Sequence, residues 1–365
     1  MRRSTDSRGT ATIRDVARAS GFSLTTVSFV LNNAPLARCI PNDTKSRIHK
    51  AAKKLGYRPN VFARSLRTSL SHTVGLMVFD ITDPYCTPIA CGIQNALYQA
   101  SYVPLRTDVQ NDRTRFERSL EMLLGPCVEG LVVIANWLFM DVNLLADLEK
   151  NSTPTVMIGR EPGVGSVSSV IVDNEAGGFA ALEHLYSLGH RQIAFMRGPK
   201  TLADNSARWR GIQNFARSRK LEINTSLVVD LPERNVPLSA FDGGLRLMRE
   251  LLRASRTFTA VLAFDDVSAL GAMRALAEAD IRVPHECSVI GFDDINLAAL
   301  CTPSLTTIRQ PLVMMGSVAV TLLLEAAAAL RDSRDFAAVH RTVAPELVVR
   351  ESTAAPCVTK LHSAT

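Results

Sequence analysis

The sequence lacks the motifs that mark the common enzyme and metal classes. It contains no Gly-x-Gly-x-x-Gly, no Walker A loop, no Gly-x-Ser-x-Gly and no His-Glu-x-x-His. Its seven cysteines are odd in number, widely scattered and free of any Cys-x-x-Cys pair, so we expect free thiols rather than disulfides or a zinc site. We therefore expect no cofactor and no metal, and an enzymatic function has no motif to support it.

A secretion signal and long apolar runs are also missing. We expect no membrane-spanning segment, because no apolar run in the sequence approaches the length needed to cross a bilayer. The amino terminus, Met1 to Gly9, is polar and no apolar stretch follows it. These absences predict a cytoplasmic protein with no membrane partner. With 365 residues and 47% hydrophobic content, the chain is long enough to fold into two or three domains with buried cores.

Positive charge is concentrated in the first fifth of the chain. Residues 1–71 contain 14 Lys and Arg against 3 Asp and Glu, a net charge of +11. The remainder contains 27 against 32, a net charge of −5. A terminal excess of this size is typical of a protein that binds a polyphosphate such as nucleic acid. The alternative is a solvated basic face with no partner.

Within this basic region, two short helical patterns meet at a glycine. Thr12 and Asp15 have the spacing of a capping box, Gly21 allows a left-handed turn, and Ser23 is a natural N-cap for the second helix. Apolar residues of the two helices can face each other: Ile13, Val16 and Ala17 from the first, and Val27, Val30 and Leu31 from the second. The outward side then carries Leu24, Thr25, Ser28 and Phe29. This pattern is typical of a helix-turn-helix, although an ordinary helical hairpin is the alternative.

Further helical patterns follow within the basic region. A third helix is expected over about 43–55, with Ile48, Ala51, Ala52 and Leu55 as its apolar stripe. Pro59 opens a pattern of about two turns over 60–67, which is too short to be fully helical without a partner. Residues 1–10 are expected to form a disordered basic arm.

From Ser71 onward, strand and helix patterns alternate. This alternation predicts parallel, doubly wound α/β sheets in two tandem lobes. We expect lobe one to comprise about 72–160 plus 293–323, and lobe two about 161–292 plus 324–350, with 351–365 as a tail. The tail has no sustained heptad that would predict a tetramerising coiled coil. Ligands bind such folds at the carboxyl ends of the strands.

Several segments resemble the LacI/GalR family of bacterial transcription regulators. They include Thr-Ile-Arg-Asp-Val-Ala-Arg-Ala-Ser-Gly-Phe-Ser at 12–23, Lys-Lys-Leu-Gly-Tyr-Arg-Pro-Asn at 53–60 and Ser-Val-Ile-Gly-Phe-Asp-Asp at 288–294. The resemblance implies an all-α helix-turn-helix headpiece at 11–58, a hinge helix and linker at 59–71, and a core at 72–350 whose two α/β lobes resemble periplasmic binding proteins. It implies a repressor that binds double-stranded operator DNA as a homodimer and responds to a small-molecule effector, which we expect to be a carbohydrate.

The resemblance also implies which headpiece residues meet DNA. Leu24, Thr25 and Phe29 would read bases, and Thr12, Thr26, Ser28, Asn32 and Tyr57 would hold phosphates or orient the headpiece. Asn60, Ala63 and Leu66 match the hinge helix, whose leucine inserts into the minor groove. The family usually has Arg at the position of Phe29. This phenylalanine either contacts an apolar base group such as a thymine methyl or only packs on a neighbour.

The effector residues implied by the resemblance come from both lobes. They are Arg208, Asp265, Asp293 and Gln310 in lobe two, with Phe79, Asp83, Tyr85 and Arg160 in lobe one; Trp137 is a further aromatic that could stack on a sugar ring. Structural alternatives are helix capping by Asp265 and Asp293, a surface ion pair for Arg208, and packing for Trp137. A soluble sugar-binding receptor and an α/β enzyme acting on a sugar or nucleoside are the alternative functions. Effector identity, and whether it releases or promotes DNA binding, are open.

Overall fold

The computed structural model describes residues 11–32, 34–57, 70–110, 112–124, 128–134, 153–160, 167–200, 202–232, 239–254 and 257–357. The chain divides into two compact units between Ser71 and His72, the point where the sequence predicts the α/β core to begin. We call these units the headpiece and the core. The expected basic arm at 1–10, residue 58 at the end of the expected headpiece and residues 59–69 of the expected hinge lie outside the described residues.

Short helices built on local caps form the headpiece. They are α1 (Ile13–Ser20), α2 (Leu24–Leu31), the 3-10 helix η1 (Pro35–Cys39) and α3 (Asn42–Lys54). The predicted capping box of Thr12 and Asp15 is present, Gly21 is left-handed with φ of 74°, and the Ser23 hydroxyl accepts a hydrogen bond from the Thr26 amide. The buried core of this unit consists of Val16, Val27, Val30, Ile48 and Ala52. Burial of these five side chains fixes the helices against one another, as the apolar stripes predict.

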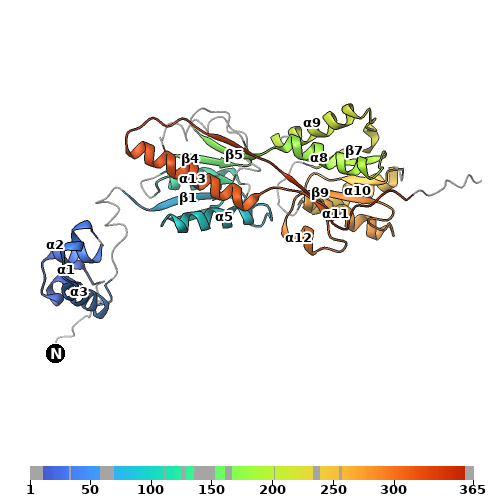
Figure 1. Ribbon diagram of the computed structural model, residues 1–365. Coiled ribbons are helices and arrows are strands. Elements are labelled where there is room, and N and C mark those ends of the chain that lie inside the picture. The colour runs from blue at the N-terminus through green and yellow to red at the C-terminus, as the bar shows by residue number, and fades with distance from the viewer. Residues whose placement is uncertain are drawn as a thin grey trace, which may run out of the picture. The chain divides into compact units, whose positions relative to one another are not determined.

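The core contains two sheets with helices on both faces (Figure 1). In lobe one the strand order is β11-β5-β4-β3-β1-β2, and all neighbours are parallel. In lobe two the order is β12-β10-β9-β8-β6-β7, and β12 alone of the described strands runs antiparallel to its neighbour. The lobe-one strands are β1 (Thr73–Val78), β2 (Val103–Asp108), β3 (Leu131–Ile134), β4 (Thr155–Ile158), β5 (Ser168–Val172) and β11 (His340–Val343). The lobe-two strands are β6 (Ile193–Arg197), β7 (Val228–Asp230), β8 (Ala260–Leu262), β9 (Ser288–Asp293), β10 (Thr306–Arg309) and β12 (Glu346–Val348).

Amphipathic helices cover each sheet. Lobe one has α5 (Cys86–Gln99) and α13 (Leu312–Arg331) on one face and α6 (Arg113–Leu123) on the other, each with its own apolar cluster. Lobe two has α8 (Asn174–Ser187) and α9 (Ala203–Ser218) on one face, and α10 (Ser239–Ala254) and α11 (Asp266–Glu278) on the other. The short helices η2 (Thr225–Leu227) and α12 (Asn296–Leu300) complete the described elements. This is the doubly wound arrangement that the alternating sequence pattern predicts.

The sheets correct the expected lobe boundaries. β5 pairs with β4 in lobe one, although the sequence placed residues after 160 in lobe two. β10 pairs with β9 in lobe two, whereas α13 and β11 belong wholly to lobe one. Residues 351–354, expected in the tail, also pack on lobe two, where Ser352 is fully buried and donates to the Val289 carbonyl at 2.6 Å. These assignments depend on strand pairing between distant segments, which local patterns do not encode.

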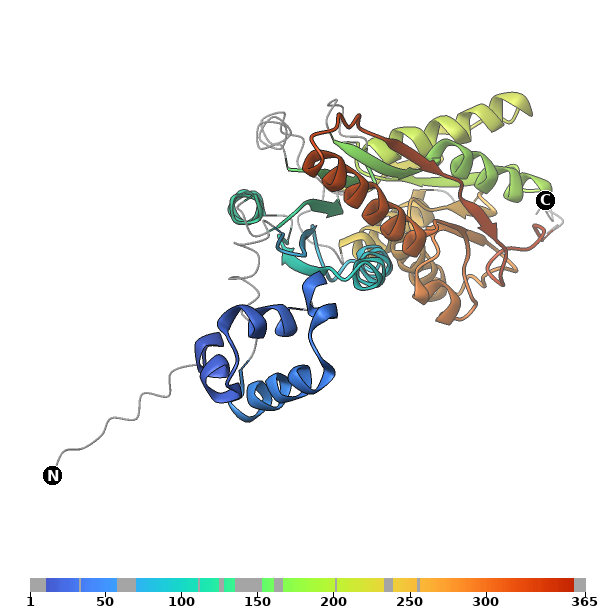
Figure 2. The same ribbon diagram turned by 60° about the vertical axis from the view of Figure 1, so that its left-hand side comes forward.

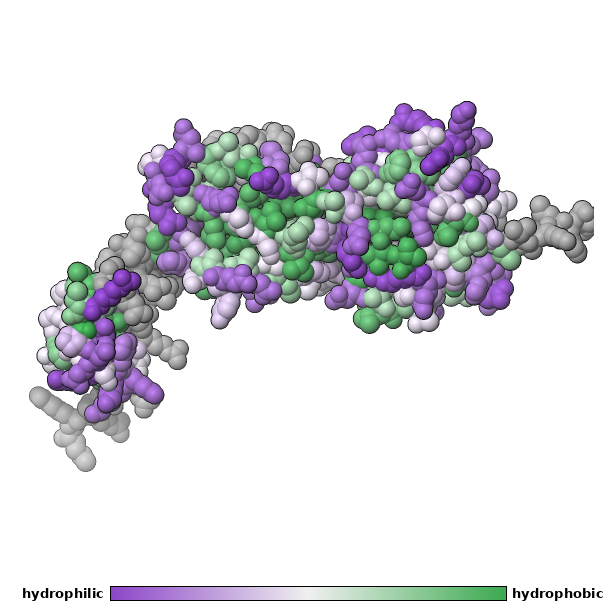
Figure 3. Space-filling model, in the orientation of Figure 1, coloured by the Kyte–Doolittle hydropathy of each residue, from purple (hydrophilic) through white to green (hydrophobic). Residues whose placement is uncertain are grey.

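One helix, α13, has the length and apolar composition needed to span a bilayer. The expectation that no segment has them is therefore wrong. Helix α13 has 20 residues, and its most apolar window has a mean hydropathy of 2.0, although half of that window is buried in the core. It packs against α5 and against strands of lobe one (Figure 2). Val313 and Met314 on its other side are about half exposed, and Figure 3 shows apolar surface over this helix. In this structure α13 is a core helix of lobe one.

Candidate functional site

The second headpiece helix presents a small exposed surface. Leu24 is 45% exposed, Thr25 is exposed, and Ser28 and Phe29 are half-buried. These are the residues that the sequence places on the outward side of the helix.

Several polar headpiece residues are fixed by bonds within the headpiece. The Thr12 hydroxyl donates to Asp15 Oδ2 at 2.7 Å, and Asn32 Nδ2 donates to the Ser28 carbonyl at 2.9 Å. Thr26 shares a hydrogen bond of 2.8 Å with the Ser23 hydroxyl. Tyr57 is half-buried beside the apolar core, and this burial raises the pKa of its phenol. These bonds orient the side chains but leave lone pairs and N–H groups that can still reach a phosphate.

The third headpiece helix carries cations on its surface. Arg47, Lys50, Lys53 and Lys54 of α3 are exposed, and the guanidinium of Arg47 lies 4.8 Å from the centroid of the Phe22 ring. Since the described part of the headpiece has Asp15 and Asp43 as its only carboxylates, this surface attracts polyanions.

In the core, polar residues converge on Arg208 at the carboxyl ends of the lobe-two strands. Its Nε donates to Asn174 Oδ1 at 2.8 Å, and its Nη1 donates to the Phe264 carbonyl at 2.6 Å. The guanidinium also lies 4.5 Å from the centroid of the Phe264 ring and 3.7 Å from that of Phe292. Arg208 is therefore not a surface ion-pair residue: it is 7% exposed and fixed on three sides.

Asp293 and Gln310 lie beside this arginine. Asp293 Oδ1 is 3.7 Å from Arg208 Nη2 and accepts a hydrogen bond of 2.6 Å from Gln310 Nε2. Burial raises the pKa of Asp293 well above its ordinary value, while Arg208 opposes the shift. The amide oxygen of the same side chain, Gln310 Oε1, is buried and has no hydrogen-bond partner among the described residues. A buried acceptor without a donor is costly, so a ligand hydroxyl would stabilise it.

Lobe one contributes Tyr85 and Arg160 to the same region. Burial raises the pKa of Tyr85 well above its ordinary value, and the carboxylates of Asp204 and Asp293 raise it further. Burial lowers the pKa of Arg160, and the negative charge of Asp204 opposes this shift. These influences act between the lobes, because Asp204 and Asp293 belong to lobe two. The structure thus brings together Tyr85, Arg160, Arg208, Asp293 and Gln310.

Other expected effector residues lie differently. Phe79 has no exposed surface and packs on Phe116, with ring centroids 5.9 Å apart, because it follows β1 on the face covered by α6. Stacking of Phe79 on a sugar ring is therefore not possible in this arrangement. Asp83 is buried and accepts a hydrogen bond from the Tyr85 amide at 3.0 Å, which fixes the turn that carries Tyr85. Trp137 lies outside the described residues.

Asp265 has the capping role that was its structural alternative. Its Oδ1 accepts a bond of 2.7 Å from the Ser268 amide, so that it N-caps α11. The adjacent Asp266 is fully buried and accepts from the Ile295 amide and the Thr307 hydroxyl at 2.9 and 2.5 Å. Burial raises the pKa of Asp266 to about 8. An asparagine at position 265 could also cap α11. The aspartate differs from it by adding negative charge beside the site.

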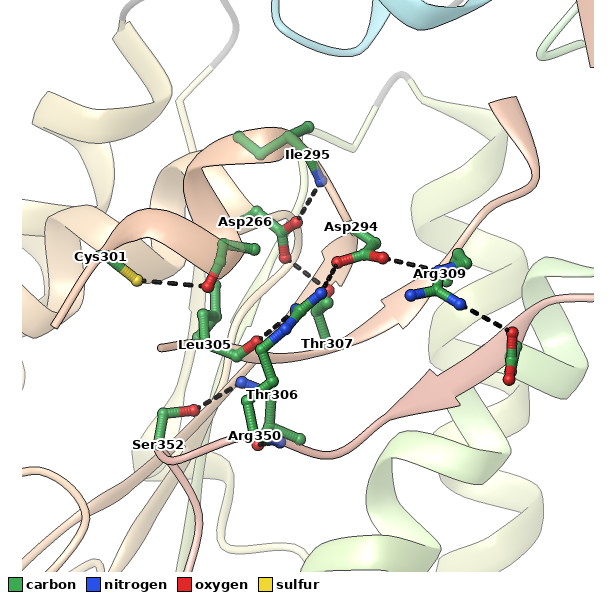
Figure 4. A network of polar contacts seen from close by, with 12 residues as sticks. Asp266, Asp294, Ile295, Cys301, Leu305, Thr306, Thr307, Arg309, Arg350 and Ser352 are labelled. Atoms are coloured by element: carbon green, nitrogen blue, oxygen red, sulfur yellow. Dashed lines mark hydrogen bonds and ion pairs between the residues drawn. The ribbon is translucent and has the colours of Figure 1, made fainter. Parts of the chain in front are cut away.

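An ion-pair network adjoins the site (Figure 4). Asp294 directly follows Asp293 and has a left-handed backbone, with φ of 59°. Its carboxylate accepts from Arg309 Nε at 2.7 Å and from Arg350 Nη2 at 2.5 Å. Arg309 lies where the chain leaves β10 for α13, and it also contacts Glu346 at 3.1 Å. Through Arg309 and Glu346, the carboxylate of Asp294 is linked to two segments in which the chain crosses between the lobes. One follows β10 and the other precedes β12.

Sequence reasoning missed Asn174 and Asp204. Asn174 begins α8 directly after β5, and its side chain contacts both Arg208 and Asp204. Asp204 lies in the first turn of α9, four residues before Arg208, and burial raises its pKa. A signal was available: both are polar residues at a helix start that follows a parallel strand. A small cavity of about 20 Å³ lies beside Arg208 and is lined by aromatic rings that include Trp209 and Phe292.

Comparisons with known proteins agree with this architecture. Residues 12–60 match the model of bacterial regulatory proteins of the lacI family, and residues 182–353 match that of a periplasmic binding protein-like domain. Over 94% of the chain and 98% of the relative, the sequence is 33% identical to the HTH-type transcriptional repressor PurR of Haemophilus influenzae strain PittEE.

The chain is also similar to solved structures of transcription regulators. The chain is similar to the lac repressor dimer bound to operator and the anti-inducer ONPF, with a TM-score of 0.79 and 26% identity over 95% of this chain and all of that one. It is also similar to the transcriptional regulator CelR in complex with cellobiose, with a TM-score of 0.69 and 29% identity over 94% of this chain and 99% of that one.

Proposed function

Because this chain belongs to the LacI family of bacterial regulatory proteins, we propose that it represses transcription as a homodimer on operator DNA under the control of a carbohydrate bound between its lobes. It is a DNA-binding transcriptional regulator with a small-molecule effector and not an enzyme. We place its action in the bacterial cytoplasm, on the nucleoid when it is bound to DNA.

The headpiece supports the DNA-binding half of this proposal. Leu24 and Thr25 are exposed at the start of α2, where a recognition helix meets base edges, and Phe29 lies one turn further along. The proposed phosphate and orienting residues are Thr12, Thr26, Ser28, Asn32 and Tyr57. Asn60, Ala63 and Leu66 are proposed for the hinge helix on the family resemblance alone.

The observation that carries the effector half is the set of side chains around Arg208. A fixed guanidinium, the Asp293 carboxylate and the unpaired Gln310 Oε1 present donors and acceptors toward one region at the strand ends. Such a mixture suits adjacent hydroxyl groups, and from the other lobe Tyr85 and Arg160 interact electrostatically with carboxylates of this region. The cellobiose complex of a similar regulator supports a carbohydrate. Asp83, Asp265 and Trp137 remain proposed members of this site.

The linkage between the sites is thermodynamic. A ligand that binds one closure state of the lobes better than another shifts that equilibrium by its differential affinity, typically about 1–3 kcal/mol. The operator affinity of the paired headpieces follows that shift, because a dimer presents its two headpieces to two half-sites at a fixed spacing.

The test combines operator binding with one headpiece variant and one core variant. Genomic fragments selected by the purified chain define the half-site, and Phe29→Arg is expected to change the preferred base at one position of it, because Arg pairs with guanine and Phe does not. An unchanged preference would mean that Phe29 only packs. Asp293→Ala is expected to remove the response of operator affinity to carbohydrates while leaving the ligand-free affinity intact. Absence of any sequence preference at moderate salt would refute the proposed function.

A further inference from the structure

The chain enters the core through a residue with an unusual backbone conformation. His72 is the first residue of the core unit, directly before β1, and its φ of 49° lies in the left-handed region. A residue with a side chain adopts this conformation at a cost in free energy. Its ring nitrogen Nδ1 is also buried and has no hydrogen-bond partner among the described residues. Two such costs at one residue persist only where the surrounding structure imposes them.

The carboxylate of Glu129 holds His72 in this conformation. Its Oε1 accepts a hydrogen bond of 2.6 Å from the His72 amide, and its Oε2 accepts one of 2.9 Å from the Tyr102 hydroxyl. The Glu129 side chain is 11% exposed, and hydrogen bonds to a carboxylate are stronger than those between neutral groups. The His72 carbonyl accepts a further bond of 2.9 Å from the Val103 amide. Both polar groups of the His72 backbone are therefore fixed, the N–H by Glu129 and the C=O by the start of β2.

These groups lie at the amino ends of three neighbouring strands. His72 and Tyr102 directly precede β1 and β2, and Glu129 lies two residues before β3. The strands are already held by their backbone ladder, in which Thr73 pairs with Val103. The proposed effector site lies at the opposite edge, at the carboxyl ends of the strands. Neither that site nor the register of the sheet requires the carboxylate, and what Glu129 determines is the course of the chain just before β1.

A third contact of Glu129 is partly exposed to solvent. Arg331 lies in the last turn of α13, its Nη2 is 3.9 Å from Glu129 Oε2, and its side chain is 47% exposed. A long ion pair with a solvated partner contributes little to stability. Glu129 thus has three partners, His72, Tyr102 and Arg331, and the last two can be removed one at a time without touching the bond to His72.

We propose that Glu129 is a positioning residue for operator binding: by holding the backbone of His72, it sets the direction in which the chain leaves lobe one toward the headpiece. This inference rests on the binding of a homodimer to two half-sites proposed above. A dimer selects the spacing of its half-sites only if each headpiece is attached to its core at a defined point and in a defined direction. Without the carboxylate each headpiece still binds DNA, but the spacing is no longer selected. A purely structural role for Glu129 predicts no change in that selection.

The experiment measures how binding of the full chain depends on half-site spacing. The duplexes are the genomic fragment selected by the wild-type chain, a scrambled fragment of the same length and composition, and the selected fragment with two base pairs inserted between its half-sites. Binding is followed by fluorescence anisotropy below the thermal midpoint of each variant. The insertion is expected to weaken wild-type binding at least tenfold. In Glu129→Ala we expect this penalty to fall below threefold, because affinity for the selected fragment is lost, while affinity for the scrambled fragment stays within twofold of the wild type.

Further variants separate positioning from stability. Glu129→Gln keeps an amide oxygen that can accept a bond from the His72 amide, so its insertion penalty should lie between those of the wild type and Glu129→Ala. Tyr102→Phe and Arg331→Gln each remove one other partner of Glu129 and should keep the wild-type penalty, whatever their thermal midpoints.

The outcomes distinguish this inference from the proposed function. An unchanged penalty in Glu129→Ala, a lost penalty in Tyr102→Phe, or equal binding of the wild type to both spacings overturns the inference. If Glu129→Ala does not fold, Glu129→Gln replaces it, and an unchanged penalty there overturns the inference. Failure of the wild-type chain to select any genomic fragment overturns the proposed function itself.

Discussion

Asp294 gives the sharpest test of how the site is held in place. Its side chain is 10% exposed and pairs with Arg350, which is 16% exposed, and with Arg309, which is 43% exposed. Substitution by Asn suits the left-handed backbone at this position and keeps one acceptor oxygen, but it removes the negative charge between two guanidinium groups.

The expected magnitude follows from burial. Breaking a buried ion pair by removing one partner costs about 3–5 kcal/mol, because the other charge stays buried and unpaired. The retained amide oxygen can still accept a hydrogen bond worth about 1 kcal/mol. Asp294→Asn should therefore destabilise lobe two by about 2–4 kcal/mol. Arg309→Gln should cost less than about 1 kcal/mol, since Arg309 is partly exposed to solvent and Asp294 keeps Arg350.

The assay is urea unfolding at pH 7, followed by the fluorescence of Trp209, which lies in lobe two, in a Trp137→Phe background. Glu250→Gln is the matched control, because Glu250 pairs with Arg246 at an exposed surface of lobe two and should change stability by less than about 0.5 kcal/mol. If Asp294→Asn costs no more than this control, or if Arg309→Gln costs more than Asp294→Asn, the argument from burial is refuted.

Further predictions concern three other parts of the molecule. Burial raises the pKa of Asp266 to about 8 from an ordinary value of 3.8, so the folded chain keeps a proton that the unfolded chain releases, and stability should fall as pH rises between these values. Asp266→Asn should flatten that decline in urea unfolding series at pH 6 and 9; an unaltered slope would contradict the assignment. Gly178→Ala would place a methyl group 2.2 Å from the Arg208 carbonyl oxygen, so α9 must shift. Calorimetry should then show at least tenfold weaker carbohydrate binding. Unchanged binding would show that α9 tolerates the shift. Leu66→Ala should weaken specific operator binding much more than non-specific binding in gel-shift assays, because an apolar wedge acts only at a kinked step; equal losses would argue against a wedge.

Local patterns in the sequence were sufficient wherever the cause is local. The cap at Thr12, the turn at Gly21 and the N-cap at Ser23 each depend on residues within four positions, and all three are present in the structure. The alternation of strands and helices likewise predicted two parallel α/β lobes, since each buried parallel strand is a continuous apolar run. The sequence divides the segment 293–350 between the lobes at residue 323, whereas strand pairing places β10 and β12 in lobe two, and α13 and β11 belong to lobe one.

The site residues likewise divide into those that the sequence indicates and those that only contacts between distant segments reveal. Arg208, Asp293 and Gln310 were identified from sequence because each follows a strand or begins a helix in a segment that resembles the family. Phe79 met the same criteria but is buried, since a residue just beyond a strand can face either the ligand or the helix layer, and the pleat of the sheet decides which. Asn174 and Asp204 belong to the site because both interact with Arg208. Arg208 lies on a different helix from Asn174 and one helical turn after Asp204.

The sequence by itself therefore determined the elements, their caps, the basic headpiece and the class of fold, because these depend on spacing along the chain. Only the tertiary structure decided which lobe receives β5 and β10, which polar atoms are buried without partners, and which carboxylate opposes each arginine. Those outcomes arise from contacts between segments that are distant in sequence, and their energies depend on burial that exists only once the sheets have formed.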